Sequence, residues 1–230
     1  MKKSDKKLNP HTKQNSGVGV NKIVKTLIIS DIAFWTGWGL LTPVFAIFII
    51  DKIQGGNALV VGIASAVYLI VKSILRIPVG KMLDGRVSEK DDYLIMVLGT
   101  FIASLVSFGY IFSSLPWHIY LLETVHGIGL ALALAGWVAI FSRHIDKGKE
   151  STQWGWNETT LGLGMGVAGA LGGFFVTKFG FNLVFSLVGI LGIIGALLLF
   201  GLRNEIKGVF DKGLKVPIKE IFKADRTDGF

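Results

Sequence analysis

Glu123 and His126 are the residues whose types and spacing point most directly to chemistry. They stand three positions apart inside a long apolar stretch, so a helix there would carry both side chains on one face. A carboxylate and an imidazole held together in a membrane are suited to taking up and releasing protons, which indicates proton coupling. The alternative is a satisfied hydrogen bond between helices with no further role.

Three more ionisable residues lie inside apolar stretches. Asp31 falls in the first stretch, and Lys72 and Arg76 lie one helical turn apart in the second. Because a charge in a membrane needs a partner, we expect Asp31 to form a structural ion pair with Lys72 or Arg76. Asp31 is also a third candidate for proton coupling. The alternative for the basic pair is that both side chains extend to the membrane surface.

Six runs of at least 19 residues without Asp, Glu, Lys or Arg must position these groups. At about 1.5 Å per residue, a helix of that length crosses a hydrocarbon core of about 30 Å. Barrel strands would be about half as long and would alternate in polarity. The sequence therefore predicts an all-α integral membrane protein with six transmembrane helices, near residues 26–50, 57–79, 93–113, 117–142, 153–177 and 181–202.

Positive charge is concentrated on one side of these spans. Of the 24 Lys and Arg residues, 20 precede the first span, follow the last one or lie in the loops 80–92 and 143–152. Basic flanks resist translocation, so both termini are expected in the cytoplasm, with the protein in the plasma membrane in contact with lipid. No nucleic-acid-binding module accompanies the charge. The chain has no cysteine, and the sequence indicates neither a metal nor a cofactor.

The chain divides into three parts. Residues 1–22 form a disordered cytoplasmic tail, 23–202 the six-helix transmembrane domain, and 203–230 a cytoplasmic amphipathic tail. Disorder is the alternative for this last segment. Short connections predict that spans one and two, three and four, and five and six are antiparallel neighbours.

The loop after the second span resembles a signature of the major facilitator superfamily, in which a glycine is followed four residues later by an aspartate and then by a basic cluster. Gly80, Asp84 and Lys90 match this pattern. Arg86 sits one place late, and Val87 replaces the second glycine.

Two further stretches are similar to the same family. Span four reads Glu-Thr-Val-His-Gly at 123–127, where the family often has Arg-x-x-x-Gly, so the spacing holds and the charge is reversed. Span five reads Ala-Gly-Ala-Leu-Gly-Gly at 168–173, similar to the Gly-Pro-x-x-Gly-Gly stretch of the superfamily's antiporters.

The resemblance implies the amino-terminal six-helix half of a facilitator, built from two inverted three-helix repeats. A second half is then expected from another copy of the chain or from a separate protein, unless the chain is a fragment or a relic. Because the first and fourth helices line the cavity in this family, the resemblance also implies a substrate-cavity wall. Its residues would be Trp35, Trp38, Thr42 and Trp137. The alternative is that Trp35 and Trp38 contact lipid and that Trp137 anchors the helix at the membrane surface.

These features lead to one main hypothesis about function. The chain is expected to be a secondary-transporter half-unit that moves a small solute, by proton-coupled efflux, as a dimer or with a second half. The alternative is a truncated or non-transporting membrane protein, such as a scaffold. An enzyme is not expected, because the sequence contains no nucleophile or zinc motif and no catalytic residues can be assigned.

Overall fold

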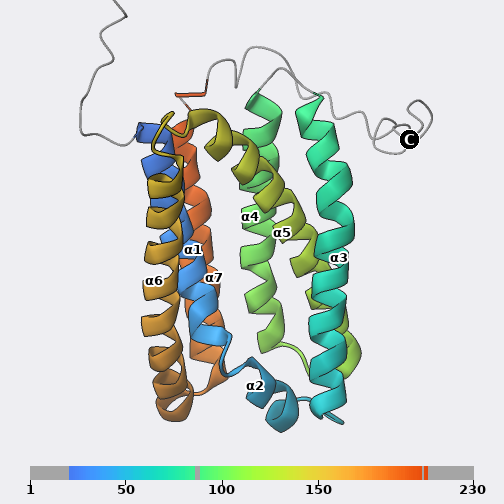
Figure 1. The fold of residues 1–230 in the computed structure, drawn as a ribbon. Helices are drawn as coiled ribbons and strands as arrows, with labels where there is room; N and C mark the ends of the chain where they lie inside the picture. Colours follow the sequence, from blue (N-terminus) through green and yellow to red (C-terminus); the bar gives the residue numbers. More distant parts are fainter. Residues whose placement is uncertain (1–20, 86–88, 204, 207–230) are drawn as a thin grey trace, which may run out of the picture.

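The computed structural model describes residues 21–85, 89–203 and 205–206 of the chain. Six of its helices are long and apolar enough to cross a membrane, which agrees with the predicted all-α membrane fold. Most of the predicted tails, 1–22 and 203–230, lies outside the described residues. The elements are α1 (Lys22–Leu41), α2 (Phe45–Lys52), α3 (Ala58–Asp84), α4 (Glu89–Ile111), α5 (Pro116–His144), α6 (Glu150–Phe179), α7 (Phe181–Leu199) and the 3-10 turn η1 (Phe200–Leu202) (Figure 1).

The first span differs from the continuous helix expected over 26–50. It ends at Leu41, and a separate helix, α2, begins at Phe45. Pro43 lies between them, and a proline removes a backbone N–H donor and crowds the preceding turn. The chain turns there, so α2 lies at the lower end of the bundle, between the end of α1 and the start of α3 (Figure 1).

Helix packing follows an inverted repeat. Helix α1 packs on α6 and α7, and α5 packs in the same way on α3 and α4, while α4 contacts α7. If α1 is exchanged with α5, α3 with α6, and α4 with α7, the same helix pairs remain in contact. Because α1 and α5 run in opposite directions, the relation between the repeats is inverted (Figure 1).

The expected pairing of successive spans is correct for only one pair. Helices α4 and α5 pack along each other, but α1 does not pack along α3, and α6 has only limited contact with α7. Short loops bring helix ends together without forcing the helices to pack, and here α2 adds to the distance between α1 and α3. Each repeat instead places its first helix against the other repeat.

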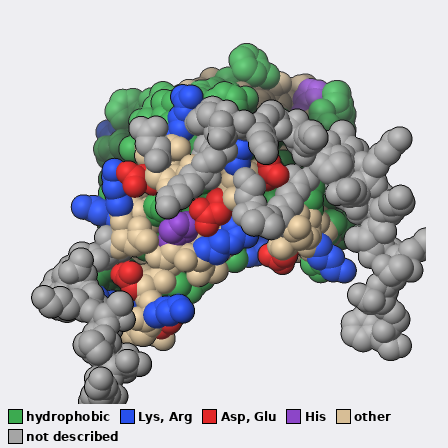
Figure 2. Space-filling model, turned by 90° about the horizontal axis from the view of Figure 1, so that it is seen from above, with side chains coloured by type: hydrophobic (Ala, Val, Ile, Leu, Met, Phe, Trp, Pro, Cys, Tyr) green, Lys and Arg blue, Asp and Glu red, His purple; other side chains and the backbone are tan. Residues whose placement is uncertain are grey.

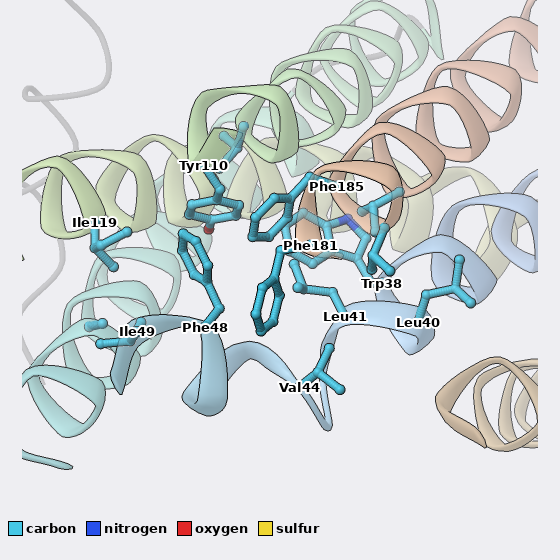
Figure 3. Close-up of a cluster of buried hydrophobic side chains, with 14 of the residues drawn as sticks. Trp38, Leu40, Leu41, Val44, Phe48, Ile49, Tyr110, Ile119, Phe181 and Phe185 are labelled. Atoms are coloured by element: carbon cyan, nitrogen blue, oxygen red, sulfur yellow. The ribbon is translucent and has the colours of Figure 1, made fainter. Parts of the chain in front are cut away.

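Aromatic packing fixes α2 to the bundle. The ring of Phe48 lies 4.7 Å from that of Phe185 and 5.4 Å from that of Phe181, both on α7. It also contacts Tyr110 of α4, so α2 packs against a helix from each of the two repeats (Figure 3). Such aromatic contacts stabilise a fold beyond the apolar surface that they bury.

Charged side chains gather at one end of the bundle, which we call the charged end. It holds the start of α1, the end of α3, the start of α4 and the connection between α5 and α6 (Figure 1). Figure 2 looks onto this end and shows Lys, Arg, Asp and Glu side chains over it. The opposite end carries α2 and the short connection between α6 and α7.

Candidate functional site

Three aromatic rings from three helices form a stack. The imidazole of His126 on α5 lies 3.9 Å from the indole of Trp38 on α1 and 4.7 Å from the phenol ring of Tyr68 on α3, measured between ring centroids. The planes are nearly parallel, at 10° and 20°. The stack fixes the orientation of the imidazole.

The carboxylate of Glu123 lies one turn from this stack. Its Oε1 accepts a 2.8 Å hydrogen bond from the hydroxyl of Tyr110, and its Oε2 lies 3.6 Å from Nδ1 of His126. Glu123 is 5% and His126 6% exposed. Neither ring nitrogen of His126 has a hydrogen-bond partner among the described residues. An acid and a base at this separation can exchange a proton through one bridging water or after a small closing movement.

These side chains border a cavity of about 250 Å³ between α1, α3 and α5. Sequence reasoning named Glu123 and His126 for coupling and Trp35, Trp38 and Thr42 for the cavity wall, and the structure brings all five to this one cavity. Other lining residues are Leu41, Phe45, Ser65 and Tyr68. The walls are therefore mostly apolar with a few polar groups, which is typical of a small-molecule site.

Asp31 and Trp137 lie elsewhere. Both border a small cavity of about 20 Å³, together with Thr100 of α4. The indole of Trp137 stacks on Phe141, and its Nε1 is buried without a hydrogen-bond partner in the described part of the chain. Trp35 lines both this cavity and the one of about 250 Å³.

The expected ion pair of Asp31 with Lys72 or Arg76 is not formed in the structure. The ammonium of Lys72 instead donates a 3.0 Å hydrogen bond to the hydroxyl of Tyr68 and lies 4.5 Å from the centroid of that ring. The reason is the packing described above: Asp31 on α1 faces a cavity bordered by α4, α5 and α7, whereas the two basic residues are on α3.

The loop motif lies at the charged end. Gly80 and Asp84 line a cavity of about 370 Å³ between α3 and α5, which Arg76 and Arg143 also border. Lys90 is in the first turn of α4. Arg86 lies outside the described residues, so its place in the motif stays a prediction.

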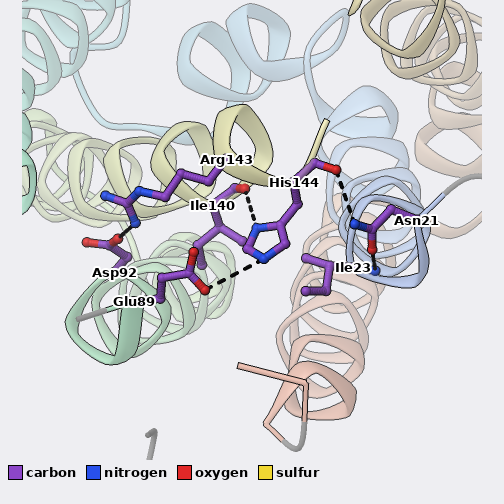
Figure 4. A network of polar contacts seen from close by, with 7 residues as sticks. All are labelled: Asn21, Ile23, Glu89, Asp92, Ile140, Arg143 and His144. Carbon is purple, nitrogen blue, oxygen red and sulfur yellow. Dashed lines mark hydrogen bonds and ion pairs between the residues drawn. The ribbon is translucent and has the colours of Figure 1, made fainter. Parts of the chain in front are cut away.

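A polar network connects helix ends next to this cavity (Figure 4). Arg143 of α5 forms an ion pair with Asp92 of α4. His144 lies 3.7 Å from a carboxylate oxygen of Glu89, and its carbonyl accepts a hydrogen bond from the Asn21 side chain. The network ties the charged ends of α1, α4 and α5 together. Within 21–85, 89–203 and 205–206, no three acidic or histidine side chains gather as metal ligands would.

The family model described as Major Facilitator Superfamily matches residues 27–226. The chain belongs to the major facilitator superfamily. Its fold is also similar to that of a POT family transporter, PepTSo, whose structure was determined in meso, with a TM-score of 0.62 at 13% sequence identity. The similarity covers 80% of this chain and 38% of the transporter's chain. No curated protein matches the sequence.

Membership in the superfamily agrees with the resemblance seen in the loop motif and in spans four and five. The facilitator fold also explains which site residues sequence reasoning missed. Tyr68 and Ser65 of α3 and Tyr110 of α4 are ordinary residues in apolar helices, and only the packing of α3 and α4 on α5 brings them to the site. The sequence gives only a weak indication that Asp92 and Arg143 pair, because both lie where a predicted span meets a loop.

Proposed function

We propose that this chain moves a small solute across a membrane as one six-helix half of a facilitator. The observation that supports this most is the cavity of about 250 Å³ between α1, α3 and α5, with a buried carboxylate and a stacked imidazole in an apolar wall. A cavity of this size suits a small solute rather than a large one. The similarity to a transporter fold is consistent with that role.

Proton coupling is assigned to Glu123 and His126. A proton on either group changes the charge of the cavity wall, and therefore changes the free energy of binding any polar solute there. Asp31 is retained as a second proton site, because Trp35 lines its cavity as well as the main one. The antiporter-like glycine stretch at 168–173 favours efflux as the direction.

The remaining helices of the transporter are proposed to come from a second copy, from another chain or from a further part of the same polypeptide, because this chain spans 38% of the matched transporter. The charged end is assigned to the cytoplasm and the protein to the plasma membrane, on the basis of the basic flanks. Crosslinking in native membranes followed by native mass measurement tests the assembly, and a lone six-helix chain would contradict it.

A transport assay on everted membrane vesicles tests the proposed function. We expect vesicles that contain the protein to accumulate at least one of three probes, ethidium, fluorescein or glucose, when a proton gradient is imposed. Ser65→Trp should reduce this accumulation about tenfold or more, because its indole would occupy a cavity that must admit the solute.

Ser73→Trp is the matched control. Ser73 is on the same helix and exposed, but it does not line the cavity, so transport should stay near the wild-type rate. Equal probe levels in vesicles with and without the protein would contradict transport of these solutes. Equal loss in both variants would show that a bulky residue on α3 acts by disturbing the helix rather than by filling the cavity.

A further inference from the structure

Lys72 is a charged residue next to the site that the proposed coupling does not use. It lies one turn from Tyr68 on α3, and its ammonium contacts both the hydroxyl and the ring of that residue. Because the Tyr68 ring lines the cavity and stacks on His126, the ammonium is placed at the cavity's edge. A positive charge inside a transmembrane segment is costly and indicates a function.

The ammonium of Lys72 forms no ion pair with an acidic side chain in the described part of the chain. Glu123 has the hydroxyl of Tyr110 and the imidazole of His126 as partners. Within residues 21–85, 89–203 and 205–206, by contrast, the only polar partner found for the Lys72 ammonium is a neutral hydroxyl. An ammonium so placed keeps N–H donors that an anion would satisfy.

Tyr68 supplies a second donor beside it. Its hydroxyl oxygen accepts the hydrogen bond from Lys72 over 3.0 Å, which leaves its own O–H free to donate, and no acceptor for that O–H is found in the described part of the chain. Two donors at this separation match the two oxygens of a carboxylate. Hydrogen bonds to a charged group are about twice as strong as neutral ones.

Positive charge continues from this point toward the charged end. Arg76 lies one turn beyond Lys72 on α3, and together with Arg143 it borders the cavity of about 370 Å³ between α3 and α5. Asp84 is the opposing charge in that cavity, and Arg143 is already paired with Asp92. Arg76 is exposed. An anion that approaches from the charged end would thus meet a basic side chain before it reaches Lys72.

We propose that the solute of this transporter is an organic carboxylate with an apolar body. Its carboxylate accepts hydrogen bonds from the Lys72 ammonium and the Tyr68 hydroxyl, and its apolar part packs among Trp35, Trp38 and Phe45. This inference rests on the proposed transport site and names the class of solute that the site takes. It makes Lys72 a residue that determines specificity.

Three ligands with one apolar body and different charge test the inference: naphthoate, naphthylmethylammonium and naphthylmethanol. Binding to the full chain is measured by calorimetry in nanodiscs of phosphatidylcholine, which contain no anionic headgroup to compete for Lys72. We expect naphthoate to bind about tenfold more tightly than the other two. Lys72→Gln should weaken naphthoate binding about tenfold and leave naphthylmethanol binding nearly unchanged.

Two variants accompany this change. Tyr68→Phe keeps the ring that stacks on His126 and removes only the hydroxyl, so naphthoate binding should weaken about threefold. Lys81→Gln removes a lysine of the same helix that lines neither cavity, and it should bind all three ligands like the wild type. If Lys72→Gln does not fold, carboxylate specificity is still tested by two results: the relative affinity of the wild type for the three ligands, and the naphthoate affinity of Tyr68→Phe.

Each other result counts against the inference. Equal binding of the three ligands, or tighter binding of the ammonium, would overturn carboxylate specificity but leave the proposed solute site intact. Naphthoate binding that is unaffected by both Lys72→Gln and Tyr68→Phe would overturn the role of the donor pair. If none of the ligands binds, the inference fails, and the vesicle assay decides separately whether the proposed transport function fails with it.

Discussion

Replacing Glu123 with Gln is expected to abolish proton-driven transport while the protein remains folded and inserted in the membrane. Glutamine has nearly the shape of glutamate, and its side-chain carbonyl can still accept the hydrogen bond that Tyr110 donates over 2.8 Å. It cannot bind and release a proton. The 3.6 Å contact with His126 then loses its ionisable partner. Because general acid–base groups typically contribute a hundredfold or more, we expect proton-driven flux to fall by about a hundredfold, or to background.

The measurement compares flux at several external pH values in vesicles with wild-type protein and with each variant. Glu158→Gln is the matched control, since Glu158 is also within a membrane-spanning helix, yet it is exposed on α6 and away from the cavity. Its flux and pH dependence should match those of the wild type. If Glu123→Gln kept the wild-type pH dependence, Glu123 would have no part in coupling.

The fold class could be predicted from the sequence because the physical constraint is strong. A backbone in hydrocarbon must satisfy its own hydrogen bonds, so six apolar runs of sufficient length indicate six helices. The break at Pro43 does not follow from the proline alone, since proline is tolerated in some membrane helices, as Pro78 is inside α3. At Pro43 the helix does break, and the Phe48 ring of the separate helix α2 packs against α7.

The candidate site was predictable in part, for a different reason. Glu123 and His126 share a helix face, so their proximity follows from spacing alone. Trp38 could be placed near them only through the family resemblance. Tyr68 could not be placed at all, because loop lengths alone leave open which helices pack together. The absence of the expected Asp31 ion pair has the same cause, because short loops indicate that successive spans pack together, whereas the inverted repeat separates α1 from α3.

The site depends on the same cross-packing. His126 stacks between an indole from α1 and a phenol from α3, two helices that do not pack along each other. Any movement of α1 relative to α3 must therefore change this stack and the cavity beside it. The imidazole and the Glu123 carboxylate both border this cavity, so the proposed proton sites lie where the movement acts. In this way protonation and the shape of the cavity can be coupled without a long pathway.

Arg143→Ala is expected to destabilise the protein by about 1.5 kcal/mol, because it leaves the buried Asp92 carboxylate without its counter-charge, although solvent already screens the partly exposed Arg143. Asp92 is 0% exposed, and its Oδ1 has no hydrogen-bond partner within the described residues, so the ion pair with Arg143 is its main compensation. The free energy of unfolding is measured by titration with a denaturing detergent. Arg76→Ala is the control: it removes an exposed arginine near the same cavity and should change stability by about 0.5 kcal/mol or less.

A double variant separates lost charge pairing from lost packing. Asp92→Asn combined with Arg143→Ala removes both charges, and a neutral amide costs less to bury than an unpaired carboxylate. The double variant should therefore be more stable than Arg143→Ala alone. If it were instead less stable by the sum of the two single effects, the two residues would act independently. In that case α4 and α5 would be held together at the charged end by apolar contacts and not by the ion pair. Met96 and Ile140, which belong to one cluster of buried apolar side chains, are examples of such contacts.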